Sequence, residues 1–263
     1  MNDPFPAVAE AAAAGQTAEL FADIRATVGV RVVNLVWRHL ATIEGALPWT
    51  WTAVKPLYVR GIADAAVVHF RESMVLPRLD GLDGERPASV DAVLASYDHS
   101  NTINLFTLGA LVAWLEEDVA AEGTPEEGPR LAAPDVTLPK LASEEDVAPE
   151  TWQCVLRLNR FGDSAQPLIL ASMYRHLAHA PAFLRRLEEV LAPVAADGSL
   201  AQAIATNRAA ARARARVLAR AIRADRPAMA DAIATSVSAF RDHAIGKMVT
   251  ICRSIRMAGE RSS

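Results

Sequence analysis

The 263-residue sequence contains only two cysteines, Cys154 and Cys252, which lie far apart in the chain. This excludes a disulfide framework and the closely spaced pairs of zinc or redox sites, so we expect two buried thiols in a reducing compartment. No apolar run reaches the roughly 18 residues that a membrane span needs. The first residues also lack the basic region of a secretory signal. These absences predict a cytoplasmic protein with no membrane partner.

An excess of charge of one sign is also missing. The chain carries 27 Lys and Arg against 31 Asp and Glu, a formal net charge of −4. Such a balance gives no electrostatic reason to expect nucleic acid as a partner. No Gly-rich phosphate loop, GxSxG elbow or HExxH pair occurs, so the sequence predicts no metal site.

Helical patterns account for most of what is present. Apolar residues make up 51% of the chain, which is ample for a buried core. Sustained period-two alternation is absent, whereas helical spacing of apolar residues runs through 8–28, 50–70 and 200–224. Ser89 is a good N-cap for a further long helix over 90–119. The predicted fold class is all-α.

One four-residue motif occurs twice in the chain. Arg38-His39-Leu40-Ala41 returns as Arg175-His176-Leu177-Ala178, and 175 − 38 = 137. A period this long is not that of a solenoid, whose repeats span about 20–50 residues. It indicates one domain-sized unit that was duplicated and fused. The same offset also matches Leu47 with Leu184, Pro56 with Pro193 and Gly61 with Gly198.

The segment between the two copies has a different composition. From Glu122 to Glu150 it holds five prolines, two glycines and an excess of acidic residues, so it cannot bury enough apolar surface to fold alone. We therefore predict a first helical repeat at 1–120, a Pro-rich acidic linker at 121–150 and a second repeat at 151–263. The two repeats are expected to pack as an intrachain pseudo-dimer.

Charged residues on the last helices allow two interpretations. A stripe at intervals of four follows one face of the predicted helix over 200–224. It is either a solvated face, or a surface that attracts small anions or pairs with the acidic linker. The stripe consists of Arg208, Arg212, Arg216 and Arg220.

Polar residues inside apolar helices are the candidates for a functional site. Asp98 and Asn101 are three positions apart in the long predicted helix and share one face. A buried carboxylate and a buried amide need hydrogen-bond partners or a polar cavity. Asp98 recurs as Asp242 together with the histidine that follows it, which favours a structural role. Asn101 has Ile245 opposite it, and an unshared polar residue is the better functional candidate.

The repeated Arg-His pair is more simply structural, because both copies keep it. Arg38 and Arg175 could each cap helix carbonyls or pair with an acid where the units meet. The adjoining His39 and His176 are poor metal ligands without further donors nearby.

The duplicated helical units, the Pro-rich linker and the run 38–42 before a Gly/Pro break resemble the DehI-type (group I) DL-2-haloacid dehalogenases. The runs 94–97, leading to Asn101, and 189–195 are also similar. The resemblance implies an all-α pseudo-dimer with its active site between the units. It further implies hydrolysis of short 2-halo carboxylic acids without a metal or organic cofactor. In that family an Asp of the second unit, helped by an Asn of the first, activates the water that displaces halide.

The family's residues carry over only in part. The assisting Asn corresponds to Asn101, and the Ser that precedes the catalytic Asp corresponds to Ser172. The Asp itself corresponds to Met173, which cannot accept a proton. A pocket Tyr corresponds to Phe240, and an aromatic residue expected near Val32 is absent. The predicted site comprises Asn101 and Asp98 as catalytic residues, and Ser172, Met173, Phe240, Val32 and Leu35 as substrate-binding residues.

Three functions follow from this sequence. The first is a cofactor-free hydrolase of a small 2-halo carboxylic acid, with Asn101 orienting water and Asp98 as the provisional base. The second is an inactive or repurposed relative that binds a small apolar ligand, which Met173 and Phe240 favour. The third is a structural dimerisation module, which would have no enclosed cavity. A homodimer is possible in each case.

Overall fold

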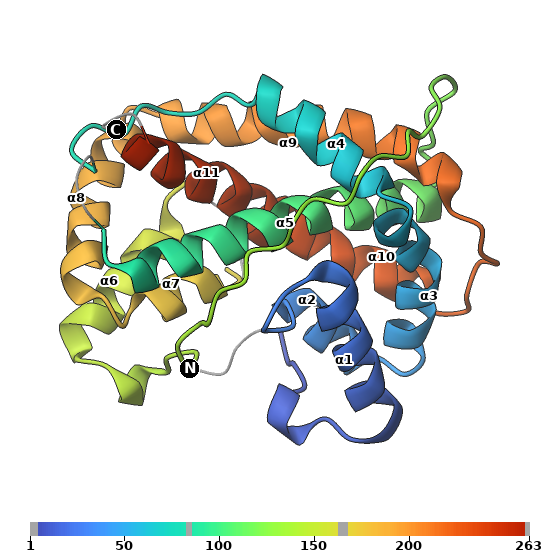
Figure 1. Cartoon of the computed structure of the whole chain (residues 1–263), viewed down its shortest axis with the longest axis horizontal. Helices are drawn as coiled ribbons and strands as arrows, with labels where there is room; N and C mark the ends of the chain where they lie inside the picture. The colour runs from blue at the N-terminus through green and yellow to red at the C-terminus, as the bar shows by residue number, and fades with distance from the viewer. Residues whose placement is uncertain (1–4, 83–85, 163–167, 261–263) are drawn as a thin grey trace.

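The structure, a computed structural model, describes residues 5–82, 86–162 and 168–260 (Figure 1). Within these ranges the regular elements are helices joined by loops, and no strand occurs. The predicted all-α class is confirmed. None of the described helices is both long and apolar enough to serve as a transmembrane span.

The first half of the chain forms a short 3₁₀ turn, Glu10–Ala12, and then α1 (Gly15–Val28), α2 (Leu35–Leu40), α3 (Ala46–Val59), α4 (Ile62–Ser73) and α5 (Ala88–Leu115). The prediction of one helix over 50–70 is wrong. Gly61 adopts the left-handed conformation, with φ +67°, and separates α3 from α4. Ser89 is not an N-cap either, because the extended Pro87 occupies that position and α5 begins at Ala88.

The second half begins with a 3₁₀ turn, Glu144–Asp146, followed by α6 (Pro149–Arg160), α7 (Ser172–Leu177), α8 (Pro181–Ala196), α9 (Ser199–Leu218), a 3₁₀ turn (Ala219–Ala221), α10 (Ala230–Ala239) and α11 (Gly246–Glu260). A π-helical segment, Phe240–Ile245, joins α10 to α11. The helix predicted over 200–224 therefore stops earlier, at Leu218.

The two halves show the same local features at matching positions. The Arg-His pairs lie in α2 and α7, and a proline is enclosed in α3 and in α8. A left-handed glycine precedes α4 and α9, at Gly61 and Gly198. This order agrees with the predicted duplication, which we keep as our interpretation.

Two hydrophobic cores hold the molecule together, and each contains residues from both halves. The core around α1–α4 and the second part of α5 also takes Ile233 and Val237 from α10. The core around α6–α8 takes Val90 and Leu94 from α5, together with Ile255 from α11. The predicted units are thus intertwined rather than side by side.

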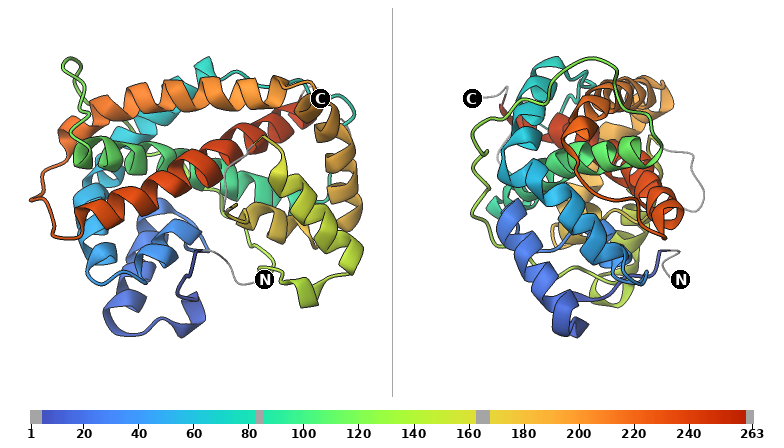
Figure 2. Two further views of the ribbon diagram at one scale, coloured as in Figure 1. Left: turned by 180° about the vertical axis from the view of Figure 1, so that it is seen from behind. Right: turned by 90° about the vertical axis from the view of Figure 1, so that its right-hand side faces the viewer.

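Helix α5 lies at the centre of this arrangement. It runs through the middle of the molecule with α9 and α11 packed along it (Figures 1 and 2). Every residue from Ser96 to Ala113 is buried. A helix covered on all sides cannot be amphipathic, which explains why apolar and small residues occur all round it.

The predicted linker crosses one face of the first half as an extended segment, drawn in light green in Figure 1. Its Leu131 N–H donates to the buried Asp64 carboxylate, at 2.8 Å between N and Oδ1. Arg60 forms an ion pair with Glu127. Backbone and charge contacts therefore hold the linker against the helices, although it has little core of its own.

The arginine stripe of α9 pairs with the chain just before and at the start of this linker. Arg216 contacts the Asp118 carboxylate at 2.8 Å, and Arg212 lies 3.9 Å from it. Arg220 donates to the Ala121 carbonyl at 3.0 Å. The carboxylate contacted, Asp118, lies just before the linker, so pairing of the stripe with the acidic side chains of the linker stays a prediction.

Candidate active site

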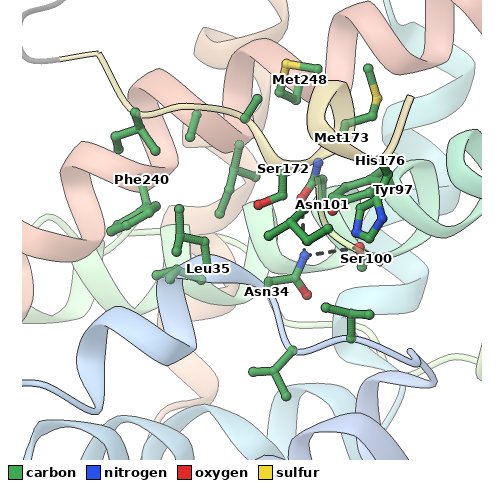
Figure 3. A pocket seen from close by; sticks show the side chains of 18 of the residues that line it. Asn34, Leu35, Tyr97, Ser100, Asn101, Ser172, Met173, His176, Phe240 and Met248 are labelled. Atoms are coloured by element: carbon green, nitrogen blue, oxygen red, sulfur yellow. Dashed lines mark hydrogen bonds between the residues drawn. The ribbon is translucent and has the colours of Figure 1, made fainter. Parts of the chain in front are cut away.

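A pocket lies where the two halves meet. Its walls come from α2, α5, α7, the π-helical segment and α11, with Leu138 and Leu141 of the linker also contributing (Figure 3). The cavity volume is about 50 Å³. Liquid water occupies about 30 Å³ per molecule, so the cavity suits only a small molecule or a few waters.

Six of the seven predicted site residues line this pocket, and Figure 3 shows most of them around one space. They come from positions far apart in the chain, in both halves. Their roles in binding and catalysis remain predictions. The six are Val32, Leu35, Asn101, Ser172, Met173 and Phe240.

Asn101 presents one end of its amide to the pocket. The side chain is 7% exposed, and its Oδ1 accepts a hydrogen bond from Asn34 at 3.4 Å. The same Asn34 amide donates to Ser100 at 3.2 Å, as the dashed lines in Figure 3 show. No described residue accepts a hydrogen bond from the Asn101 Nδ2, so this N–H group can donate to a ligand or to water.

A buried asparagine of α6 holds the backbone that leads into α7, the helix that begins with Ser172 and Met173. Asn159 accepts from the Ala171 N–H at 3.0 Å and donates to the Ile169 carbonyl at 3.1 Å. These two bonds fix the backbone immediately before α7, and thereby the direction of its first side chains. Sequence reasoning missed Asn159, since its partners are backbone atoms ten and twelve residues away.

Asp98 is not among the residues that line the pocket, so the geometry does not support its prediction as the provisional base. Its side chain is 1% exposed, and its Oδ2 lies 3.0 Å from Arg71, 3.3 Å from Arg253 and 2.5 Å from Arg256. Asp98 therefore binds α4 and α11 to α5. A carboxylate held among three guanidinium groups outside the cavity has no route to a water molecule inside it.

The pocket wall at the position of the family's Asp is apolar. Met173 is fully buried, and the Phe240 ring packs against Phe5 and His39 at centroid distances of 5.3 and 5.4 Å. Among the described residues, no carboxylate lines the cavity. Tyr97 lines it too, and burial raises the pKa of that hydroxyl, while the nearby Ser172 lowers it. The aromatic and apolar walls thus leave few groups able to take a proton.

His176 also lines the pocket, and its environment keeps the ring neutral. The side chain is 2% exposed, and burial lowers the pKa of His176 to about 4. Its ring lies 5.8 Å from that of Tyr97. Sequence reasoning assigned this histidine a structural role, because His39 repeats it in the other half.

The low pKa of His176 makes stability depend on pH. Between pH 6.5, the ordinary value, and about 4 the unfolded chain binds a proton there that the folded chain does not. The free energy of unfolding therefore falls as pH falls through this window, by up to about 3 kcal/mol from this residue. Urea unfolding of the wild type and of His176→Gln, at pH 7 and near pH 4.5, measures this pH dependence of the free energy of unfolding. The substitution is expected to flatten the dependence, and parallel pH profiles would contradict the assignment.

The π-helical segment completes the pocket from the side of α10 and α11. Phe240, Ala244 and Ile245 all lie on it and all line the cavity. Single π turns inside longer helices occur frequently at functional sites. Periodicity could not predict this turn, because the hydrophobic pattern continues from α10 into α11.

The fold and the pocket define an all-α protein with a small buried site between two intertwined helical halves. Solved structures of the same architecture exist. One is a D-2-haloacid dehalogenase mutant in complex with D-2-CPA, which matches with a TM-score of 0.72 and 18% sequence identity. The match covers 98% of this chain and 96% of the dehalogenase chain. A complex of D-2-haloacid dehalogenase with L-LA matches with a TM-score of 0.71, also at 18% sequence identity. This match covers 98% of this chain and 97% of the other.

The chain therefore has the fold of the DehI-type haloacid dehalogenases. No protein-family model matches the sequence, and no curated protein matches it. Within the described ranges, no three His, Cys, Asp or Glu side chains are grouped so that they could hold a metal ion.

Proposed function

We propose that the protein is a cofactor-free hydrolase of small 2-halo carboxylic acids that acts in the pocket between its two halves. The observation that carries the proposal is Asn101, which lines a small pocket and whose amide N–H has no acceptor among the described residues. An amide donor held in this way orients a water molecule or a substrate atom without reorganisation during the reaction. The shared fold with D-2-haloacid dehalogenases supports the same substrate class.

Positive charge near the cavity suits a carboxylate substrate. Arg38 lines the pocket, and its Nε donates to the Val33 carbonyl at 3.1 Å, which holds the guanidinium at the wall. Burial lowers the pKa of His176, and the charges of Arg175 and Arg38 lower it further. Burial raises the pKa of Tyr97, and the same two charges oppose that rise. Their field therefore reaches into the pocket, where it would favour an anionic ligand.

A second function is a catalytically inactive relative that binds a small apolar ligand in the same pocket. The observation that favours it is Met173, fully buried at the position where the resemblance expects the catalytic Asp. An apolar wall there contributes to the binding of hydrocarbon but not to proton transfer.

Halide release from 2-chloropropionate and 2-bromopropionate tests the first proposal against the second. We expect release by the wild type and a loss of kcat of about 100-fold in Asn101→Ala, because the water or substrate loses its oriented donor. Gln202→Ala removes an exposed amide on α9 and serves as the matched control. Unfolding curves of each variant separate loss of activity from loss of fold.

Met173→Asp distinguishes the two functions directly. A wild type without halide release, combined with release by Met173→Asp, would mean that the pocket is a binding site whose chemistry was lost at this position. Equal activity of the wild type and Asn101→Ala would contradict the role given to the amide.

A further inference from the structure

The two histidines of the repeated Arg-His pair have different environments. His39 is hydrogen-bonded at both ring nitrogens, by Nδ1 to the Pro6 carbonyl at 2.7 Å and by Nε2 to the Ser236 hydroxyl at 3.3 Å. In contrast, neither nitrogen of His176 has a hydrogen-bond partner within the described part of the chain. The Pro139 carbonyl is close enough to raise the pKa of His176 slightly, against the larger lowering by burial.

An unpaired imidazole at this depth needs an explanation. Leaving a buried polar group without a partner costs about 1–3 kcal/mol. The ring is 2% exposed and lines the pocket, so a water molecule or a ligand inside the cavity is the available partner. In Figure 3 the ring lies on the same side of the cavity as Ser100 and Asn101. The histidine therefore faces the place where a hydrolytic water would sit.

The position of His176 on α7 also fits this role. It follows Met173 by three residues, and positions i and i+3 of a helix lie on the same face about 5–6 Å apart. The family's base is expected at position 173. His176 thus presents a proton acceptor from the same helix face, one turn further along.

The charged and titratable groups around His176 leave the ring neutral. Tyr97 approaches it from α5, Arg38 from α2, and Arg175 and His179 belong to the segment of His176 itself. Burial disfavours a positive charge on the ring, and His179 and both arginines add to this effect. A carboxylate bound beside the ring would oppose this effect and make the imidazole more basic.

We propose that His176 is the general base of this site and accepts a proton from the attacking water. The proposal rests on the hydrolase function proposed above. As the water oxygen forms a bond to C2 of the 2-halo acid, the carbon–halogen bond breaks and the halide leaves with the electron pair. One proton of the water passes to a ring nitrogen of His176, and the imidazolium then returns it to solvent. Asn101 holds the water during this step.

The test compares His176→Gln with His39→Gln in the halide-release assay with 2-chloropropionate. Glutamine keeps a polar side chain but cannot accept the proton, so His176→Gln is expected to lower kcat at least about 100-fold with little change in KM. His39→Gln removes a buried histidine from the same motif outside the cavity, and it should retain activity within a few-fold. An active His176→Gln beside an active wild type overturns this proposal and leaves the hydrolase function standing.

A second measurement needs no variant to fold. Nitrogen-15 NMR of the wild-type ring is followed against pH with and without added 2-chloropropionate or lactate. A base that faces the bound acid should show a rise in the pKa of His176 of about one unit or more. An unchanged pKa overturns the proposal. A wild type that releases no halide overturns both proposals, and the NMR titration then reports whether the ring faces the acid at all.

Discussion

Asp98→Asn is expected to lower the free energy of unfolding by about 3–5 kcal/mol, because it removes one partner from a buried charge cluster. Three guanidinium groups, from Arg71, Arg253 and Arg256, converge on the Asp98 Oδ2 atom. Without the carboxylate they repel one another, and α4 and α11 lose their common attachment to α5. Urea unfolding monitored by circular dichroism measures the effect.

Asp242→Asn is the matched control, since Asp242 is the counterpart of Asp98 in the second half of the sequence. Its side chain is 42% exposed, and its ion-pair partner among the described residues is the adjacent Arg241, at 2.6 Å. Because the Asp242 carboxylate is partly in solvent, whereas that of Asp98 is fully buried, this variant should lose clearly less stability than Asp98→Asn. A fully stable Asp98→Asn that had lost halide release would instead restore Asp98 as a base.

Gly61→Ala is expected to destabilise the protein by about 2–5 kcal/mol, from backbone strain and a steric clash together. Gly61 has φ +67°, and a Cβ there would lie 1.9 Å from the carbonyl oxygen of Gly128. The linker cannot move away without disturbing the nearby bond from Leu131 to Asp64. Thermal and urea unfolding of the variant give the loss.

Gly198→Ala separates the two contributions. Gly198 holds the same place before α9 with φ +83°, but a Cβ there meets no atom within 4 Å. Gly198→Ala should therefore lower the free energy of unfolding only by the strain of an alanine in the left-handed conformation, about 1–2 kcal/mol. Equal losses in the two variants would show that the linker does not press against Gly61.

Local sequence patterns were sufficient for the fold class and for most of the pocket. The recurrence of Asp98 as Asp242 placed Ile245 opposite Asn101 and so led to Asn101 as an unshared polar residue. The resemblance added Ser172, Met173 and Phe240, which line the cavity together with Asn101. Two helices were merged over 50–70, because the apolar pattern continues through Gly61 while its left-handed backbone interrupts the helix. Periodicity reports which face is buried but not where a backbone reverses.

The roles of single polar residues were harder to predict. Asp98 shares a helix face with Asn101, yet its partner Arg253 lies 155 residues further along the chain, and no local pattern connects them. For His176 the repetition did not predict the environment of the ring. An identical motif suggested an identical role, whereas Ser236 provides a partner for His39 and no described side chain does so for His176.

The burial of α5 on all sides also sets the order of events during synthesis. Its partners begin 199 − 115 = 84 residues (α9) and 246 − 115 = 131 residues (α11) after α5 ends. The first half of the chain therefore leaves the ribosome with the α9 and α11 faces of α5 uncovered, and nascent chains with such surfaces aggregate readily. Neither core can close until α11 has emerged, so the native state forms late and as one cooperative unit.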